Sequence, residues 1–166
     1  PFAFAGVGLM GMSAALLETP AESGRLRFFR RHVQLPFSKT RAYYFYIALG
    51  ILVAVLSATL DHARHWEDGV LWLPTLVGIF ATFVALLLGF ISRPSKQDVQ
   101  TFAATMVVLI LTGLLGLYFH IQADLTAQGT FVLERFLRGA PILAPLLYAN
   151  MGRMGLVVLL PAKAGS

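Results

Sequence analysis

The chain has 166 residues, of which 57% are hydrophobic and only 13% are charged, and it contains no cysteine. A soluble domain is about 25% charged, so this composition indicates a protein whose main solvent is lipid. The lack of thiols excludes disulfides, thiolate metal sites and iron–sulfur ligation by this chain. Its net charge of +5 does not indicate a nucleic-acid partner, because the basic residues lie between apolar segments, where membrane topology places them.

Apolar segments along the chain predict an all-α fold. A transmembrane helix needs about 20 apolar residues to cross a hydrocarbon core about 30 Å thick. Segments near that length lie at 1–17, 42–60, 70–92, 99–121 and 140–161. They predict one transmembrane domain over 1–166, an integral membrane bundle of about five helices. Because the chain begins with Pro1, we interpret the first segment as the remainder of a longer span or an uncleaved signal-like segment.

Two connecting segments carry patterns of their own. The loop over 18–41 is rich in arginine, and at 27–31 three arginines flank two phenylalanines, which predicts an interfacial helix on the lipid surface. Arg27, Arg30 and Arg31 are its candidate contacts for anionic headgroups. Residues 130–138 are also amphipathic and predict an outer interfacial helix. Within the last span, Pro145 predicts a local kink.

The distribution of Lys and Arg in the loops predicts the orientation. The loops 18–41 and 93–98 together hold eight basic residues, whereas the loops expected on the opposite side hold three. Basic loops stay in the cytoplasm. We therefore expect the N-terminus outside and the C-terminus inside, in a membrane of the bacterial inner-membrane type.

Polar residues that can bind a metal gather on the predicted outer side. The second span is followed by Asp61, His62 and His65, and the fourth ends near His120 and Asp124. Imidazole and carboxylate ligands suit zinc, iron or manganese, and two histidines on facing helices are typical axial ligands of haem. The alternative is that these residues are solvated ends of spans, because loops at a membrane surface meet water. No established metal motif is present to decide between the two.

His120 stands out within this group because it lies inside an apolar helix near the edge of the hydrocarbon core. A polar side chain there needs a partner. Asp61, His62 and Asp124 are the nearest candidates, along with a cofactor or a neighbouring subunit.

Arg153 is the one charged residue within the last span, and Asn150 lies three residues before it. Two interpretations are open for this pair. An arginine about 9 Å from the inner interface can extend its side chain to lipid phosphate. Alternatively, Arg153 and Asn150 share a helix face and contact another subunit or a buried ligand.

Three functions follow from these patterns. The favoured one is a non-catalytic subunit that packs with other subunits in a larger membrane complex, for example an electron-transfer or energy-transducing assembly. The small size and the absence of a predicted extramembrane domain suggest it. The alternative is a protein that binds a metal ion or haem through His62, His65 and His120. A transporter or channel for a neutral solute ranks third. No catalytic set emerges, which disfavours an enzyme.

Overall fold

The structure is a computed structural model, and it describes residues 24–28, 30–63, 67–126 and 143–160. A short hairpin precedes a set of helices in this part of the chain. In order, the elements are β1 (Arg25–Phe28), β2 (Arg31–Gln34), α2 (Lys39–His62), the 3-10 turn η1 (Gly69–Trp72), α3 (Leu73–Phe90), α4 (Lys96–Thr126) and α6 (Ala144–Val158).

Local chemistry fixes where the helices begin. The Ser38 side chain accepts a hydrogen bond from the backbone of Arg41 and caps α2. At the start of α4, the backbone N–H of Ser95 donates to the Asp98 carboxylate, and the backbone N–H of Asp98 donates to the Ser95 hydroxyl. This reciprocal pair satisfies two donors that the helix itself cannot satisfy.

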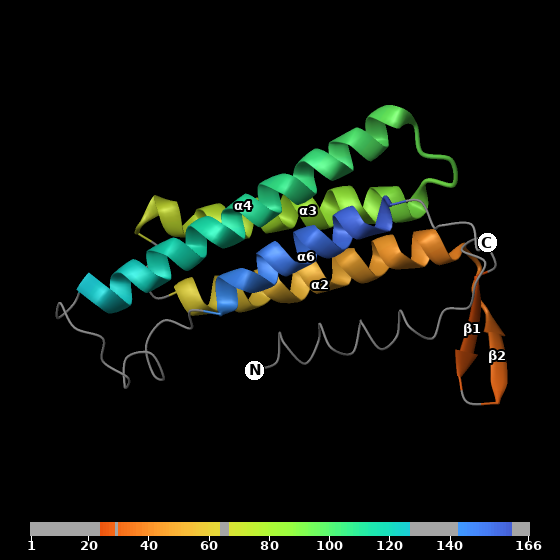
Figure 1. Ribbon diagram of the computed structural model, residues 1–166, viewed down its shortest axis with the longest axis horizontal. Helices are drawn as coiled ribbons and strands as arrows, with labels where there is room; N and C mark the ends of the chain where they lie inside the picture. The colour runs from red at the N-terminus through yellow and green to blue at the C-terminus, as the bar shows by residue number, and fades with distance from the viewer. Residues whose placement is uncertain (1–23, 29, 64–66, 127–142, 161–166) are drawn as a thin grey trace.

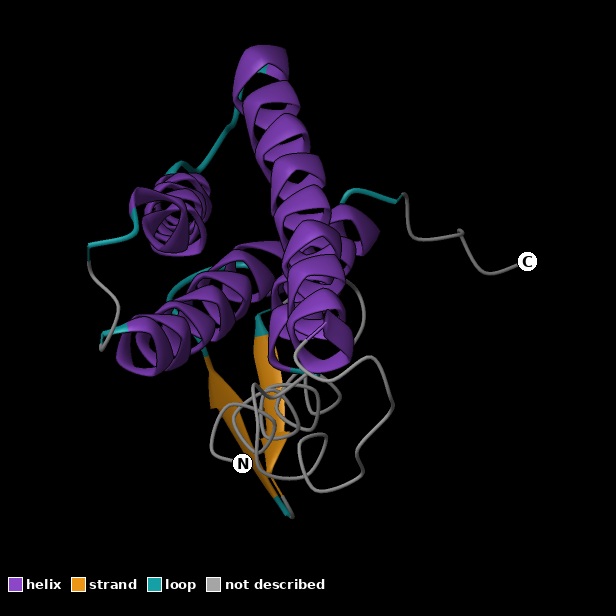
Figure 2. Ribbon diagram, turned by 90° about the vertical axis from the view of Figure 1, so that its left-hand side faces the viewer, coloured by secondary structure: helices purple, strands orange, loops and turns teal. Residues whose placement is uncertain are grey.

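The four α-helices run alternately up and down the long axis of the molecule (Figure 1). α2 packs against α3 and α6, and α4 packs against the same two helices, so α2 and α4 lie diagonally opposite. Figures 1 and 2 show that α4 is inclined to the other three helices. Consequently α2 and α4 end at one end of the bundle, where α3 and α6 begin.

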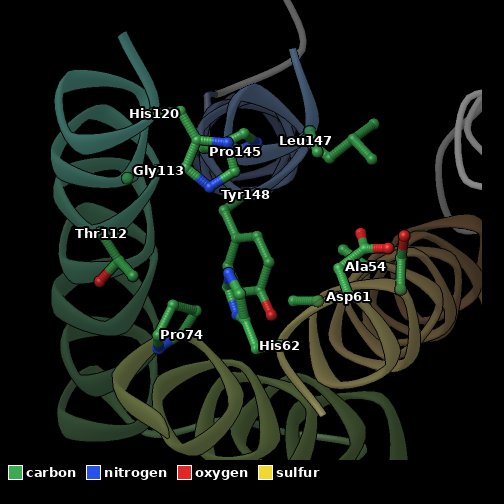
Figure 3. Close-up of a pocket in the computed structure, with 14 residues that line it drawn as sticks. Ala54, Asp61, His62, Pro74, Thr112, Gly113, His120, Pro145, Leu147 and Tyr148 are labelled. Carbon is green, nitrogen blue, oxygen red and sulfur yellow. The ribbon is translucent and has the colours of Figure 1, made fainter. Parts of the chain in front are cut away.

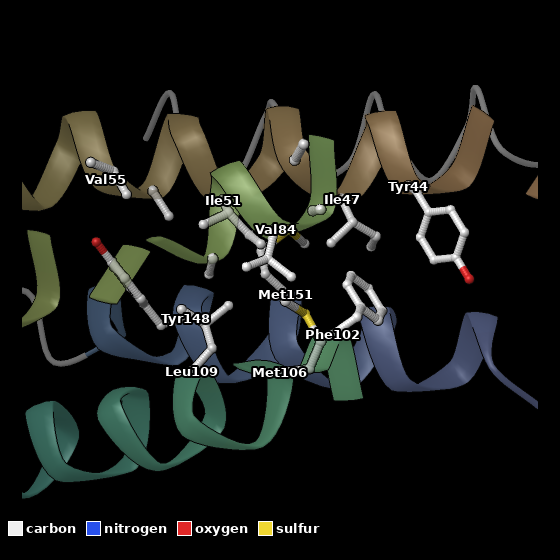
Figure 4. Close-up of a cluster of buried hydrophobic side chains, with 14 of the residues drawn as sticks. Tyr44, Ile47, Ile51, Val55, Val84, Phe102, Met106, Leu109, Tyr148 and Met151 are labelled. Carbon is white, nitrogen blue, oxygen red and sulfur yellow. The ribbon is translucent and has the colours of Figure 1, made fainter. Parts of the chain in front are cut away.

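The interior of the bundle is apolar and closely packed (Figure 4). Its largest fully buried side chains come from α2, α4 and α6, namely Ile47, Ile51, Phe102, Met106, Leu109 and Met151. The rings of Tyr44 and Phe102 meet edge to face at 5.1 Å between centroids. α2 and α3 are also joined near the cavity described below, where the hydroxyls of Thr59 and Thr75 are 3.1 Å apart.

Glycines let α4 and α6 approach each other. A Cβ atom added to Gly113 would lie 2.6 Å from the backbone nitrogen of Ala149, and one added to Gly152 would lie 2.5 Å from the carbonyl oxygen of Met106. Both distances are shorter than van der Waals contact, so only glycine fits at these two positions. Close approach through small residues is the usual way in which helices associate in lipid.

Three of the helical segments are long and apolar enough to cross a membrane: Lys39–His62, Gly69–Phe90 and Lys96–Ala123. They correspond to the predicted spans 42–60, 70–92 and 99–121. The fourth α-helix, α6, has 15 residues and occupies the middle of the predicted span 140–161. The predicted segments 1–17 and 130–138 lie outside the described residues.

Two local predictions are wrong. Residues 27–31 form no interfacial helix, because Arg25–Phe28 pairs antiparallel with Arg31–Gln34 and this hairpin projects from the end of the bundle where α2 begins (Figure 1). Pro145 does not sit in the middle of a helix, since α6 begins at Ala144. The proline therefore occupies the first turn, where the lack of an N–H costs nothing.

Candidate functional site

A small cavity lies at the end of the bundle where α2 and α4 end. Figure 3 shows side chains of four helices around it. Its volume is about 60 Å³, and the residues that line it are Ala54, Ser57, Ala58, Asp61 and His62 of α2, Pro74 of α3, Thr112, Gly113, Gly116 and His120 of α4, and Ala144, Pro145, Leu147 and Tyr148 of α6.

The cavity exists because small and ring-shaped residues meet there. Half of its lining residues are alanine, glycine and proline, which leave unfilled the space that longer apolar side chains would occupy. Deeper in the bundle, longer side chains such as Met106 and Met151 are fully buried. The cavity therefore lies toward one end of the described bundle.

Tyr148 extends from α6 into the middle of the group. Its side chain is only 4% exposed, and Figure 3 shows the ring pointing from α6 toward α2 and α3. The ring lies against Gly78 of α3, where an added Cβ would come within 3.1 Å of the phenol oxygen. Among the described residues, that oxygen has no hydrogen-bond partner. A buried hydroxyl of this kind normally has one.

His62 and His120 meet at the outer part of the cavity. Their ring centroids are 6.2 Å apart, and the ring planes are inclined at 73°. His62 is the last residue of α2, which continues two residues beyond the predicted span, and His120 lies in the last third of α4. Both rings are half-buried. The Nδ1 atom of His62 is buried and has no hydrogen-bond partner among the described residues.

The other predicted ligands do not complete a metal centre in the described part of the chain. Asp61 is exposed beside His62, and Asp124 lies one helical turn after His120 in α4. His65 lies outside the described residues. No group of three or more His, Cys, Asp or Glu side chains within residues 24–28, 30–63, 67–126 and 143–160 is placed to hold a metal ion. A cavity of about 60 Å³ is also far too small for a haem.

Arg153 and Asn150 lie apart from this cavity, further along α6. The Arg153 guanidinium is exposed and donates a long hydrogen bond of 3.4 Å to the Asn150 side-chain oxygen. The Asn150 amide lies 3.9 Å from the sulfur of Met154. Arg153 thus directs its charge outward from the bundle, where lipid or another subunit can reach it.

Basic residues cluster at the opposite end of the bundle from the cavity. They lie in the hairpin, at the start of α2 and between α3 and α4, and they are Arg25, Arg27, Arg30, Arg31, Lys39, Arg41, Arg93 and Lys96. The register pairs Arg27 with His32 and Arg25 with Gln34, so Arg25, Arg27 and His32 project from the same face of the hairpin. We call these eight residues the basic end.

Arg41 caps the C-terminal end of α3, a role that the sequence did not reveal. Its Nε donates to the carbonyl oxygen of Gly89 at 2.8 Å, and its terminal nitrogen donates to that of Phe90 at 3.1 Å. These are the last carbonyls of α3, which have no partner inside the helix. A residue counted in the sequence as a charge that determines topology therefore also caps a neighbouring helix.

The sequence singled out some of the polar residues that line the cavity. Asp61, His62 and His120 were candidates, whereas Tyr148 was not. Only the packing of α6 between α2 and α4 brings its hydroxyl to this place.

No model of a protein family, no curated protein and no solved structure matches the chain.

Proposed function

We propose that this chain is a non-catalytic, multi-pass subunit that packs against a transmembrane helix of another subunit. The observation that carries the proposal is an open apolar groove of about 550 Å³ between α3 and α4. It is lined by Leu76, Val77 and Phe80 of α3 and by Thr101, Ala104, Thr105 and Val108 of α4.

The shape of this groove suits a helix better than loosely packed lipid tails. Its α4 wall consists largely of small residues, such as Thr101 and Ala104, which allow the backbone of a second helix to come close. Its α3 wall offers Phe80, which is 56% exposed. Small residues beside a projecting aromatic ring are a surface on which a partner helix gains dispersion contacts that mobile acyl chains do not supply.

Replacing Ala104 by Trp tests this proposal. The indole fills the groove, so we expect the native complex to dissociate in mild detergent while the chain itself stays folded. Leu52→Trp is the matched control, because Leu52 is 41% exposed on α2, diagonally opposite α4. Size analysis of the protein purified from its own membrane measures both. The proposal is contradicted if Ala104→Trp leaves the assembly unchanged. It is also contradicted if the wild-type chain purifies as a monomer.

The basic end is proposed to lie at the cytoplasmic surface and to contact anionic lipid headgroups, in a membrane of the bacterial inner-membrane type. The exposed guanidiniums of Arg27, Arg30 and Arg31 project beyond α2, and each cation near an anionic surface contributes about 1 kcal/mol. Arg153 is proposed as a further contact with lipid or a partner. Replacing Arg27, Arg30 and Arg31 together by Gln should reduce the number of anionic lipids that native mass spectrometry detects on the purified protein.

A second candidate function is supported by the approach of His62 to His120. Two imidazoles in contact can share a transition metal ion, with Asp61 close by in the chain and His65 as a further candidate ligand. Stoichiometric zinc, copper or iron in the purified protein, lost in both His62→Ala and His120→Ala, would support it. Protein without metal after purification in the absence of chelator would contradict it. A haem is not proposed, given the size of the cavity.

Transport of a neutral solute is the weakest candidate. The cavity reaches only part of the way along the bundle, and beyond it the interior is closed by Ile47, Met106 and Met151. Nothing in the described part of the chain favours a continuous path.

A further inference from the structure

The cavity contains hydrogen-bonding atoms that need partners. The phenol oxygen of Tyr148 and Nδ1 of His62 are buried, and neither has a partner among the described residues. Buried polar groups in native proteins are nearly always satisfied by protein or by ordered water. His62 and Tyr148 both line the cavity, so a molecule inside it is placed to reach both atoms.

The size of the cavity limits what that molecule is. The cavity volume is about 60 Å³, and on the same measure one water molecule needs about 10–15 Å³. A few water molecules therefore fit, whereas an aromatic ring or a lipid headgroup does not. Phenol and imidazole groups can both donate and accept hydrogen bonds. Water also does both, and it therefore matches each of them.

We propose that a cluster of water molecules fills this cavity and links the Tyr148 hydroxyl to His62 and to the aqueous phase beyond Asp61. From His62 back to Ala54 the lining follows α2 for eight residues, about 12 Å, so the bundle is hydrated to about two fifths of a membrane's hydrocarbon thickness of about 30 Å. This inference does not depend on the proposed function, because it requires no other subunit.

The access of water can be measured with single cysteines, since the chain has none of its own. Ser57 lines the cavity, whereas its neighbour Leu56 is 56% exposed on the outer face of α2, toward lipid or a partner. Thiosulfonate reagents react with the thiolate, which forms only where water reaches. In the full chain in its membrane, Ser57→Cys should react about tenfold faster than Leu56→Cys. Equal rates, or faster reaction at position 56, would overturn the proposal.

The Tyr148→Phe variant tests whether the hydroxyl is hydrated. In a dry cavity an unsatisfied hydroxyl destabilises the protein, so its removal would raise the Tm. If water binds there, the variant loses a hydrogen bond and the Tm should fall by about 2–4 °C. Tyr118→Phe is the control and should leave the Tm unchanged, because Tyr118 is 56% exposed. The proposal requires both the labelling result and a lowered Tm for Tyr148→Phe; an unchanged or raised Tm overturns it.

Discussion

At the scale of single residues, Gly113 is a position where the close packing of α4 on α6 leaves no room for a side chain. An alanine methyl group there would lie 2.6 Å from the Ala149 nitrogen and 2.7 Å from the Pro145 carbonyl oxygen, and backbone atoms cannot move aside cheaply. Alanine raises helix propensity by about 1 kcal/mol, while overpacking costs about 1–3 kcal/mol. We expect Gly113→Ala to lose about 1 kcal/mol net, as measured by unfolding in mixed detergent.

The control for that substitution is Gly69→Ala. No atom lies within 4 Å of a Cβ placed on Gly69, so this variant should keep the wild-type stability. Equal stability of both variants would mean that α4 and α6 are further apart than the structure places them.

The candidate site was predictable only in part, and the reason lies in individual residues. His120 attracted notice because an imidazole within apolar sequence needs a partner, and the structure does place His62 beside it. The metal role of this pair stays a prediction. The cavity itself was not predictable, because it results from alanine, glycine and proline residues on separate helices that face one another. No single segment reveals such a convergence.

At the scale of elements, the hairpin shows why composition alone misleads. Three arginines flank two phenylalanines over 27–31, and a basic surface helix and a strand share that composition. Gly24 favours the strand: its φ is +59°, and its carbonyl oxygen accepts a hydrogen bond from the backbone of Leu35 at 2.9 Å, across the open end of the hairpin. The long apolar helices were predictable, since their length and uniform hydrophobicity leave no other structure in lipid.

The end of α3 depends on a side chain from another helix, which gives a second prediction. Arg41→Gln removes the charged donor that satisfies the carbonyls of Gly89 and Phe90, and it should lower the stability by about 1 kcal/mol. Arg41→Lys should fall between wild type and Arg41→Gln, because an ammonium group cannot bridge both oxygens with the same geometry.

Arg93→Gln is the matched control for the loss of charge. Arg93 is exposed in the turn that follows α3, so its replacement should leave the stability within about 0.5 kcal/mol of wild type. If Arg93→Gln and Arg41→Gln had the same effect, the cause would be net charge and not the capping of α3.

At the scale of the whole molecule, the sequence predicted spans but not their arrangement. α2 and α4 read alike in sequence and both pack on α3 and α6, yet α4 is inclined to the other helices (Figure 2). Glycines such as Gly113 and Gly152 decide which helices approach closely. Which helix a glycine faces depends on how each helix is rotated about its own axis, and one sequence does not reveal that rotation.

Basic residues cluster at one end of the molecule and acidic residues at the other, and a labelling experiment can test which end faces the cytoplasm. The basic end carries the hairpin and the α3–α4 turn, while Asp61, Glu67 and Asp68 lie at the opposite end. Because cytoplasmic loops are enriched in Lys and Arg, the end that carries Gly69 should face outward. Gly69→Cys should therefore react with an impermeant thiol reagent added to intact cells. Ser92→Cys, exposed in the turn after α3, should react only after the membrane is opened. The reverse pattern would put the histidine pair on the cytoplasmic side, and labelling of both cysteines in intact cells would show that α3 does not cross the membrane.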